Sequence, residues 1–229
     1  MESIVPLEPQ EARILGVLIE KELTTPDQYP LSLNATTAGC NQKSNRSPVM
    51  SLSEVEVQMQ LDKLVIAGLV GRVHPAGSRV ERFRHNICEH YDLDPTKAAI
   101  LAELMMRGPQ TRGDLRTRVQ RMTPVESLEI LAANIEPLIQ RGFVKRLPPG
   151  SGSRAERFAQ CLAPDAHAHA GDEPPAASAP AAPAPSTTTS PSTPAAPTAS
   201  STGDLERRVA RLERQIADLA EKLGETLEG

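Results

Sequence analysis

Aromatic residues are scarce in this chain, which has no Trp, 2 Tyr and 3 Phe among 229 residues. Proteins that bind single-stranded nucleic acid stack bases on aromatic rings, so the scarcity disfavours that class. No stretch approaches the roughly 18 uninterrupted apolar residues that a membrane-spanning helix needs. The 3 cysteines are too few for a disulfide scaffold in a chain of this length. The first residues lack the basic segment and apolar core of a signal peptide, so we expect a cytoplasmic protein with reduced thiols.

A strong net charge is also missing, since the whole chain carries only -4. Residues 1–162 hold 20 basic and 19 acidic side chains, whereas the remainder holds 5 and 10. The basic excess lies in residues 97–162, with 11 basic against 6 acidic side chains. Any surface that faces a polyanion is therefore expected in this block, although an excess of this size is modest for a dedicated DNA-binding domain.

The chain changes character after its first 163 residues. Residues 174–202 consist only of Ala, Pro, Ser and Thr, which offer too little apolar surface to offset the entropy of ordering. We therefore expect a disordered linker over 164–203, stiffened by its prolines.

A heptad stripe follows the linker over residues 204–228. Its apolar positions alternate spacings of four and three: Leu205, Val209, Leu212, Ile216, Leu219 and Leu223. Mostly β-branched a positions with Leu at d favour a parallel two-stranded coiled coil, so the stripe predicts a homodimer through Leu205–Leu223. The alternative is a single amphipathic helix that packs back on its own body.

The body of the chain contains an internal repeat. Residues 61–73 parallel 135–147, and residues 77–83 parallel 152–158, in the same order. An upstream apolar segment occurs in both halves as well. Matched segments in the same order predict two related domains, over 7–92 and 93–163.

Local signals predict the same elements in each half. Pro9 suits a helix start and Thr25-Pro26 a helix end, Ser51 or Ser53 can cap a third helix, and Gly68 can end it in a left-handed turn. In the first half we expect helices over 9–24, 32–40 and 51–67, and strands over 69–73 and 80–85. In the second half we expect helices over 97–107, 111–121 and 123–141, and strands over 143–147 and 155–162.

Three helices followed by a β-hairpin is the winged helix-turn-helix pattern. The predicted fold is thus mainly α with small β-hairpins: two tandem winged helix-turn-helix domains, a disordered linker and a C-terminal coiled-coil helix. Within the first hairpin Phe83 is expected to face the core. Pro137 lies inside the last predicted helix and should kink or split it.

Two segments carry a family resemblance: TPDQYPLSLNA at residues 25–35 and CNQKSNRSPV at residues 40–49. With them, residues 7–162 resemble the YceH-like family of uncharacterised bacterial proteins. The resemblance implies two tandem winged-helix domains, often followed by a C-terminal coiled helix.

Two function classes compete, and both are non-enzymatic. A winged helix usually places its third helix in the major groove of duplex DNA. However, residues 51–66 and 123–141 each carry a net charge of -2, counted over their Lys, Arg, Asp and Glu residues, which opposes phosphate attraction. Basic side chains elsewhere could still position double-stranded DNA through its phosphates: Lys43, Arg46, Arg82, Arg84, Arg112, Arg116, Arg118, Arg154 and Arg157. The alternative is a protein–protein interaction scaffold without DNA readout.

The densest polar run of the body spans residues 41–46. It reads Asn41, Gln42, Lys43, Ser44, Asn45 and Arg46. One interpretation is a ligand or partner surface, so that alanine at Lys43 and Arg46 weakens binding and spares stability. The other is a loop whose side chains satisfy local backbone groups.

Catalytic patterns are missing. There is no nucleophile elbow and no phosphate-binding glycine loop. His85, Cys88 and His90 lie close in sequence, but their spacing matches no common zinc motif. We therefore expect no catalytic residue, no metal and no cofactor, and we interpret this cluster as interdomain sequence.

Overall fold

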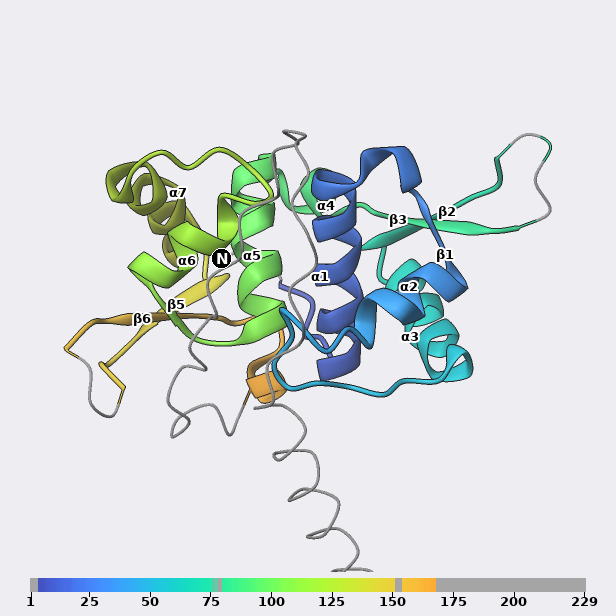
Figure 1. The fold of residues 1–229 in the computed structure, drawn as a ribbon, viewed down its shortest axis with the longest axis horizontal. Coiled ribbons are helices and arrows are strands. Elements are labelled where there is room, and N and C mark those ends of the chain that lie inside the picture. The colour runs from blue at the N-terminus through green and yellow to red at the C-terminus, as the bar shows by residue number, and fades with distance from the viewer. Residues whose placement is uncertain (1–3, 76, 78–79, 151–153, 168–229) are drawn as a thin grey trace, which may run out of the picture. The chain divides into compact units, whose positions relative to one another are not determined.

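The computed structural model describes residues 4–75, 77, 80–150 and 154–167. These residues fold into a mainly helical body with small antiparallel sheets (Figure 1). The linker predicted over 164–203 starts too early, because Pro164–His167 form a 3-10 turn that belongs to the body and in which Ala166 is buried. The rest of the predicted linker and the predicted coiled coil lie outside the described residues. The mainly α prediction with small β elements is confirmed.

The first half begins with a long central helix. Its helices are α1 (Pro9–Thr24), α2 (Leu33–Cys40), α3 (Glu54–Ile66) and the short α4 (Ile87–Tyr91). Its strands are β1 (Leu31–Ser32), β2 (Val70–Val73) and β3 (Arg82–His85), which form an antiparallel sheet in the order β1-β3-β2. A 3-10 turn, η1 (Pro26–Gln28), connects α1 to β1.

The second half repeats this order. Its helices are α5 (Pro95–Arg107), α6 (Arg112–Val119) and α7 (Leu128–Gln140), and its strands are β4 (Gln110–Thr111), β5 (Val144–Leu147) and β6 (Arg157–Gln160). The sheet order β4-β6-β5 corresponds to that of the first half. A 3-10 turn, η2 (Pro164–His167), ends the described body.

The helix starts follow one physical rule in both halves. The Ser32 hydroxyl accepts a hydrogen bond from the backbone N–H of Ala35, and Thr111 accepts one from Asp114. Ser53 and Ser127 cap α3 and α7 in the same way. Since an N-cap oxygen satisfies a backbone donor that the helix leaves unpaired, these residues fix where the helices begin.

The third helices end at glycines in the left-handed region. Gly68 follows α3 at φ +75° and Gly142 follows α7 at φ +84°. The left-handed turn predicted for Gly68 is therefore confirmed, and glycine takes this conformation without a Cβ penalty. Pro137 does not split the second of these helices, because α7 continues unbroken from Leu128 to Gln140.

The expected element bounds shift mainly at the ends. Helix α3 starts at Glu54 rather than Ser51, because Ser53 is its cap. Helix α7 starts at Leu128 rather than Thr123, because Ser127 is its cap. Short elements β1, β4 and α4 were not expected from the sequence, and the segment interpreted as interdomain sequence includes α4.

Both halves contribute to one continuous hydrophobic core. Helices α1 and α5 lie side by side at its centre (Figure 1). Gly16 allows this approach, since a Cβ at that position would lie 2.9 Å from Cγ of Met106. Phe83 is buried as expected. The core also contains the buried residues Ile14, Leu18, Val57, Leu61 and Leu64. The domain division at residues 92 and 93 stays a prediction.

Candidate interaction surfaces

The polar run after α2 forms a loop that is held largely by its own side chains. The Asn41 amide donates to the carbonyl of Leu52 at 2.8 Å and accepts from the Leu52 N–H at 2.8 Å. The Gln42 side-chain oxygen accepts from Arg46 at 2.9 Å. These bonds satisfy local groups and correspond to the second interpretation of the run.

Arg46 points into the protein. It is only 6% exposed, and it donates to the carbonyl of Gly39 at 3.1 Å and to the Glu20 carboxylate at 2.7 Å. Although burial raises the pKa of Glu20, the hydrogen bond and charge of Arg46 hold that pKa below its usual value. The expectation that Arg46 lies at a contact surface is wrong, because its guanidinium compensates a buried carboxylate.

The same loop joins the two halves. The Asn45 side-chain oxygen accepts a hydrogen bond from Arg107 on α5. The Ser47 N–H donates to the carbonyl of Met106 at 2.9 Å, and His167 Nε2 lies 2.8 Å from the Ser47 carbonyl oxygen. Only Lys43 and Ser44 of residues 41–46 are exposed.

A depression of about 690 Å³ lies beside this loop. Its wall includes three cationic side chains from both halves, together with polar groups of the loop: Lys21, Lys43, Arg121, Gln42, Ser44 and Asn45.

Glu103 is a buried carboxylate that the sequence analysis did not single out. It lies on α5, fully buried, with Arg107 Nε at 3.3 Å and Arg121 Nη2 at 3.6 Å. Within the described part of the chain, neither of its oxygens accepts a hydrogen bond. Burial raises its pKa above the usual value, and the nearby arginines oppose that rise. In the sequence, Glu103 is a single acidic residue within an otherwise apolar stretch of a predicted helix, and this pattern could have identified it as a buried carboxylate.

The arginines near the first hairpin are engaged within the molecule. Arg82 donates to the Pro30 carbonyl at 2.8 Å, across the β1–β3 pair. Arg84 forms an ion pair with Glu89 at 3.2 Å. Neither side chain is an uncommitted phosphate contact.

Most arginines of the second half are engaged too. Arg116 donates to the carbonyls of Val125 and Glu126, and Arg118 donates to the Gln110 side chain at 2.7 Å. The Arg112 guanidinium lies 5.7 Å from the centre of the Phe158 ring. These contacts hold α6 to its neighbours, so the side chains have structural partners.

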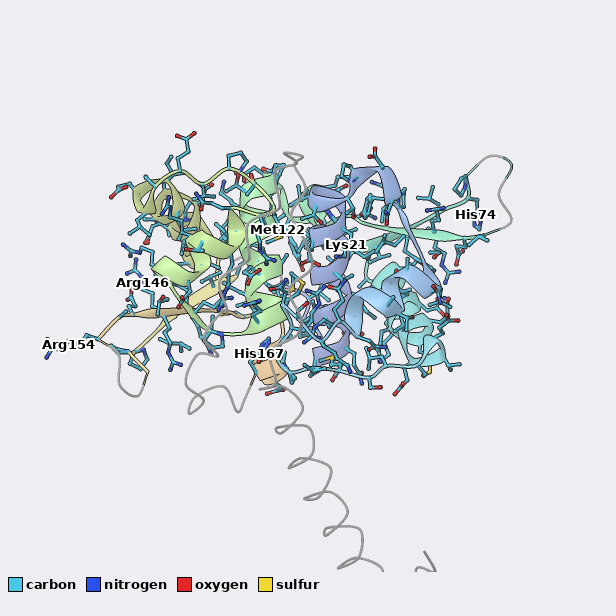
Figure 2. All side chains as sticks on the ribbon, in the orientation of Figure 1. Lys21, His74, Met122, Arg146, Arg154 and His167 are labelled. Atoms are coloured by element: carbon cyan, nitrogen blue, oxygen red, sulfur yellow. The ribbon has the colours of Figure 1, made fainter. Side chains whose placement is uncertain are left out.

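The second hairpin carries the remaining two candidates. Arg157 is half-buried, and its guanidinium lies so close to Gly150 that a Cβ there would be 3.2 Å from Cζ. Arg154 is exposed and lies at the far end of this hairpin (Figure 2). The structure therefore does not bring the nine predicted basic residues together as one basic surface.

The third helices instead expose apolar side chains. On α3, Val55 is 71% exposed, Met59 57% and Ile66 88%. Their spacings of four and seven residues place them along one face of the helix. Leu128 and Ile130 are exposed in the first turn of α7. Sequence reasoning missed this face because the same spacing also occurs on buried faces.

Two further predictions are that the protein holds no metal ion and that it contains no membrane-spanning helix. Among the described residues, no group of at least three His, Cys, Asp or Glu side chains is placed to hold a metal ion. His85 contacts Glu22 instead, with Nε2 at 2.5 Å from Oε2. None of the described helices has the length and apolar character needed to cross a bilayer.

The body is thus a mainly helical repeat with a polar loop between its halves and apolar side chains on its outward helices. Residues 7–160 match the family model described as "Protein of unknown function, DUF480", and the chain belongs to this family. It is 48% identical over 177 residues to a UPF0502 protein of Geotalea daltonii, covering 76% of this chain and 81% of that protein. It is 39% identical over 220 residues to one of Pectobacterium carotovorum, covering 93% and 97%. The predicted membership of an uncharacterised bacterial family is confirmed.

Proposed function

We propose that this protein is a non-enzymatic interaction module that docks a protein partner and does not read duplex DNA. Its framework is a pair of winged helix-turn-helix units. The element order of each half supports this assignment, since a helix, a short strand, two further helices and a hairpin are the parts of a winged helix. The predicted coiled coil would join two such chains and present two copies of each docking face.

The observation that carries the proposal is the exposed face of α3. A recognition helix that enters the major groove meets a dense array of phosphates, so acidic residues at its start are unfavourable. Helix α3 begins with Glu54 and Glu56, and its outward side carries Val55, Met59 and Ile66. Such a face suits an apolar protein surface far better than base edges.

The chemistry of the partner follows from the charges around this face. Glu54, Glu56 and Asp62 flank the apolar stripe, and Lys63 is the one basic residue on the helix. The expected partner therefore presents an apolar surface bordered by Lys or Arg side chains. Complementary charge at the rim would orient the complex, while the apolar stripe would provide most of the affinity.

The state of the basic residues supports the same conclusion. Arg46 is buried, Arg82, Arg116 and Arg118 bind internal oxygens, and Arg84 is paired with Glu89. Directing these groups to phosphates would break their existing contacts within the protein. The free energy lost with those contacts would offset much of the free energy gained from the new phosphate contacts.

The cysteines support a non-enzymatic role in a reducing compartment. All three are free thiols. Burial raises the pKa of Cys40 to about 12 and that of Cys88 to about 11. Since the thiolate is the reactive form, neither residue is activated as a nucleophile at neutral pH. Free thiols fit the cytoplasm, where we place the protein.

The test compares two exposed apolar positions in the full-length chain. Met59→Glu places a charge on the α3 face, and Val49→Glu does the same at a position that is also 57% exposed but lies in the preceding loop. We expect Met59→Glu to abolish capture of a protein partner that the wild type retains after nuclease treatment, and Val49→Glu to preserve it. Capture that is lost on nuclease treatment, or that survives Met59→Glu, would contradict the proposal.

A further inference from the structure

The depression between the halves has a surplus of positive charge. Its lining holds one carboxylate, Glu20, and a second carboxylate, Glu103, is buried behind it against the lining residue Arg121. Glu20 is shared by Arg46 at 2.7 Å and Lys21 at 3.2 Å, and Glu103 by Arg107 and Arg121. With Lys43, the lining itself carries three cationic side chains against the one carboxylate of Glu20.

Lys43 is the least committed of these cations. It is exposed, and in the part of the chain that the structure describes it has no ion-pair partner. Its neighbours can donate hydrogen bonds as well. Gln42 uses its side-chain oxygen for Arg46, which leaves its amide N–H groups as donors, and the hydroxyl of Ser44 is exposed beside it.

Arg107 lies behind the wall of the depression, and nearby cations disfavour its charged form. Burial lowers the pKa of Arg107; Glu103 opposes this shift, whereas Arg118, Arg121 and Arg46 add to it. An anion in the depression would relieve this repulsion, because it would add negative charge where cations outnumber carboxylates.

We propose that this depression binds the phosphate groups of a small phosphorylated ligand, with Lys21, Lys43 and Arg121 as the charged contacts. Its volume of about 690 Å³ suits a small molecule, since such sites typically measure about 300–1,000 Å³. Arg pairs with phosphate in a bidentate manner and Lys as a point charge. A surplus of two positive side chains in the lining matches a multiply charged phosphate chain rather than a single carboxylate.

The position of the site gives the ligand a structural consequence. Lys21 lies on α1 and Lys43 in the loop of the first half, whereas Arg121 follows α6 of the second half. A phosphate chain held by all three would tie the halves together and raise the melting temperature, because it binds only the folded state. None of these residues belongs to the exposed α3 face, so the site is separate from the proposed docking surface.

The experiment titrates pyrophosphate into the full-length protein by calorimetry and follows its melting temperature, with sodium chloride of equal ionic strength as the blank. Lys43→Glu is compared with Lys63→Glu, which makes the same charge change at another exposed lysine on α3. We expect saturable binding that Lys43→Glu weakens by about tenfold or more and Lys63→Glu leaves nearly unchanged. If Lys43→Glu unfolds the protein, Lys43→Gln serves in its place.

Three outcomes would overturn the inference. One is the lack of any heat or melting shift beyond the blank. Another is an equal loss of binding in the two lysine variants, which would indicate general charge attraction. The third is displacement of pyrophosphate by a short DNA duplex at equal phosphate concentration, which would make this surface a nucleic-acid contact. Retained pyrophosphate binding in Met59→Glu would show that the site is independent of the docking face.

Discussion

The Arg46 guanidinium lies 2.7 Å from the Glu20 carboxylate, with the two side chains 0% and 7% exposed. This ion pair fastens the loop after α2 to the central helix α1. Because the same loop also contacts α5 through Asn45 and Ser47, the pair helps to hold the two halves in register. The polar run over residues 41–46, which looks in sequence like a contact surface, therefore serves mostly to connect elements within the protein.

Removal of Arg46 should destabilise the fold strongly. In Arg46→Ala the Glu20 carboxylate stays buried without its main partner, and breaking a buried pair in this way costs about 3–5 kcal/mol. Urea unfolding followed by circular dichroism measures the loss. Lys43→Ala is the control, since this exposed side chain has no described ion pair and its removal should leave the midpoint nearly unchanged. Equal midpoints for the two variants would contradict this connecting role.

Close packing of α1 on α5 gives a second prediction. Gly16→Leu forces a side chain toward Met106 and the Ala102 carbonyl, where a Cβ alone would already lie at 2.9 and 3.3 Å. We expect a loss of about 1–3 kcal/mol in the free energy of unfolding, which is typical of overpacking. Gly113→Leu is the matched control on α6, because its nearest neighbour would be 4.0 Å away. An equal loss in the free energy of unfolding for the two leucine variants would contradict close packing of α1 on α5.

The pH dependence of stability should carry a contribution from His167. Burial lowers its pKa below the ordinary value of 6.5, although its hydrogen bond with the Ser47 carbonyl opposes the shift. The unfolded chain therefore binds a proton more readily, so the free energy of unfolding falls as the pH is lowered through 6.5. In His167→Gln this fall should be smaller. Melting temperatures of both proteins between neutral and mildly acidic pH test this, and parallel curves would exclude the contribution.

Local signals account for the parts of the fold that the sequence predicts. Ser53 and Gly68 bound α3, and the alternation around Phe83 places this ring in the core. Strands β1 and β4 have only two residues each, and they form because β3 and β6 are there to pair with them. No pattern of neighbouring residues in the sequence can predict such elements.

The candidate surfaces depend on tertiary contacts even more. Arg46 pairs with the carboxylate of Glu20, which lies 26 residues away in the sequence, and nothing in the polar run distinguishes Arg46 from Lys43. Likewise Met59 and Leu61 are both apolar residues on α3, yet only Leu61 faces the core. Which face of a helix is covered depends on the packing partner, and that is a property of the whole fold.

Duplex DNA should bind weakly at best. With Arg82, Arg116 and Arg118 engaged internally, few side chains are left to release counterions from the phosphates. Fluorescence anisotropy with a random duplex at low salt should show no saturation at micromolar protein. The same titration with Arg154→Ala should be indistinguishable from that of the wild type. Tight binding with a steep salt dependence would instead support the DNA-reading alternative.

Site-specific photo-cross-linking in cells tests the docking face most directly. A photoreactive amino acid replaces Met59 on α3 in one full-length variant and Glu89 on α4, an exposed position outside this face, in another. We predict a light-dependent protein adduct of discrete mass from position 59 that resists nuclease, and none from position 89. Adducts to DNA, or equal adducts from both positions, would contradict a docking role for α3.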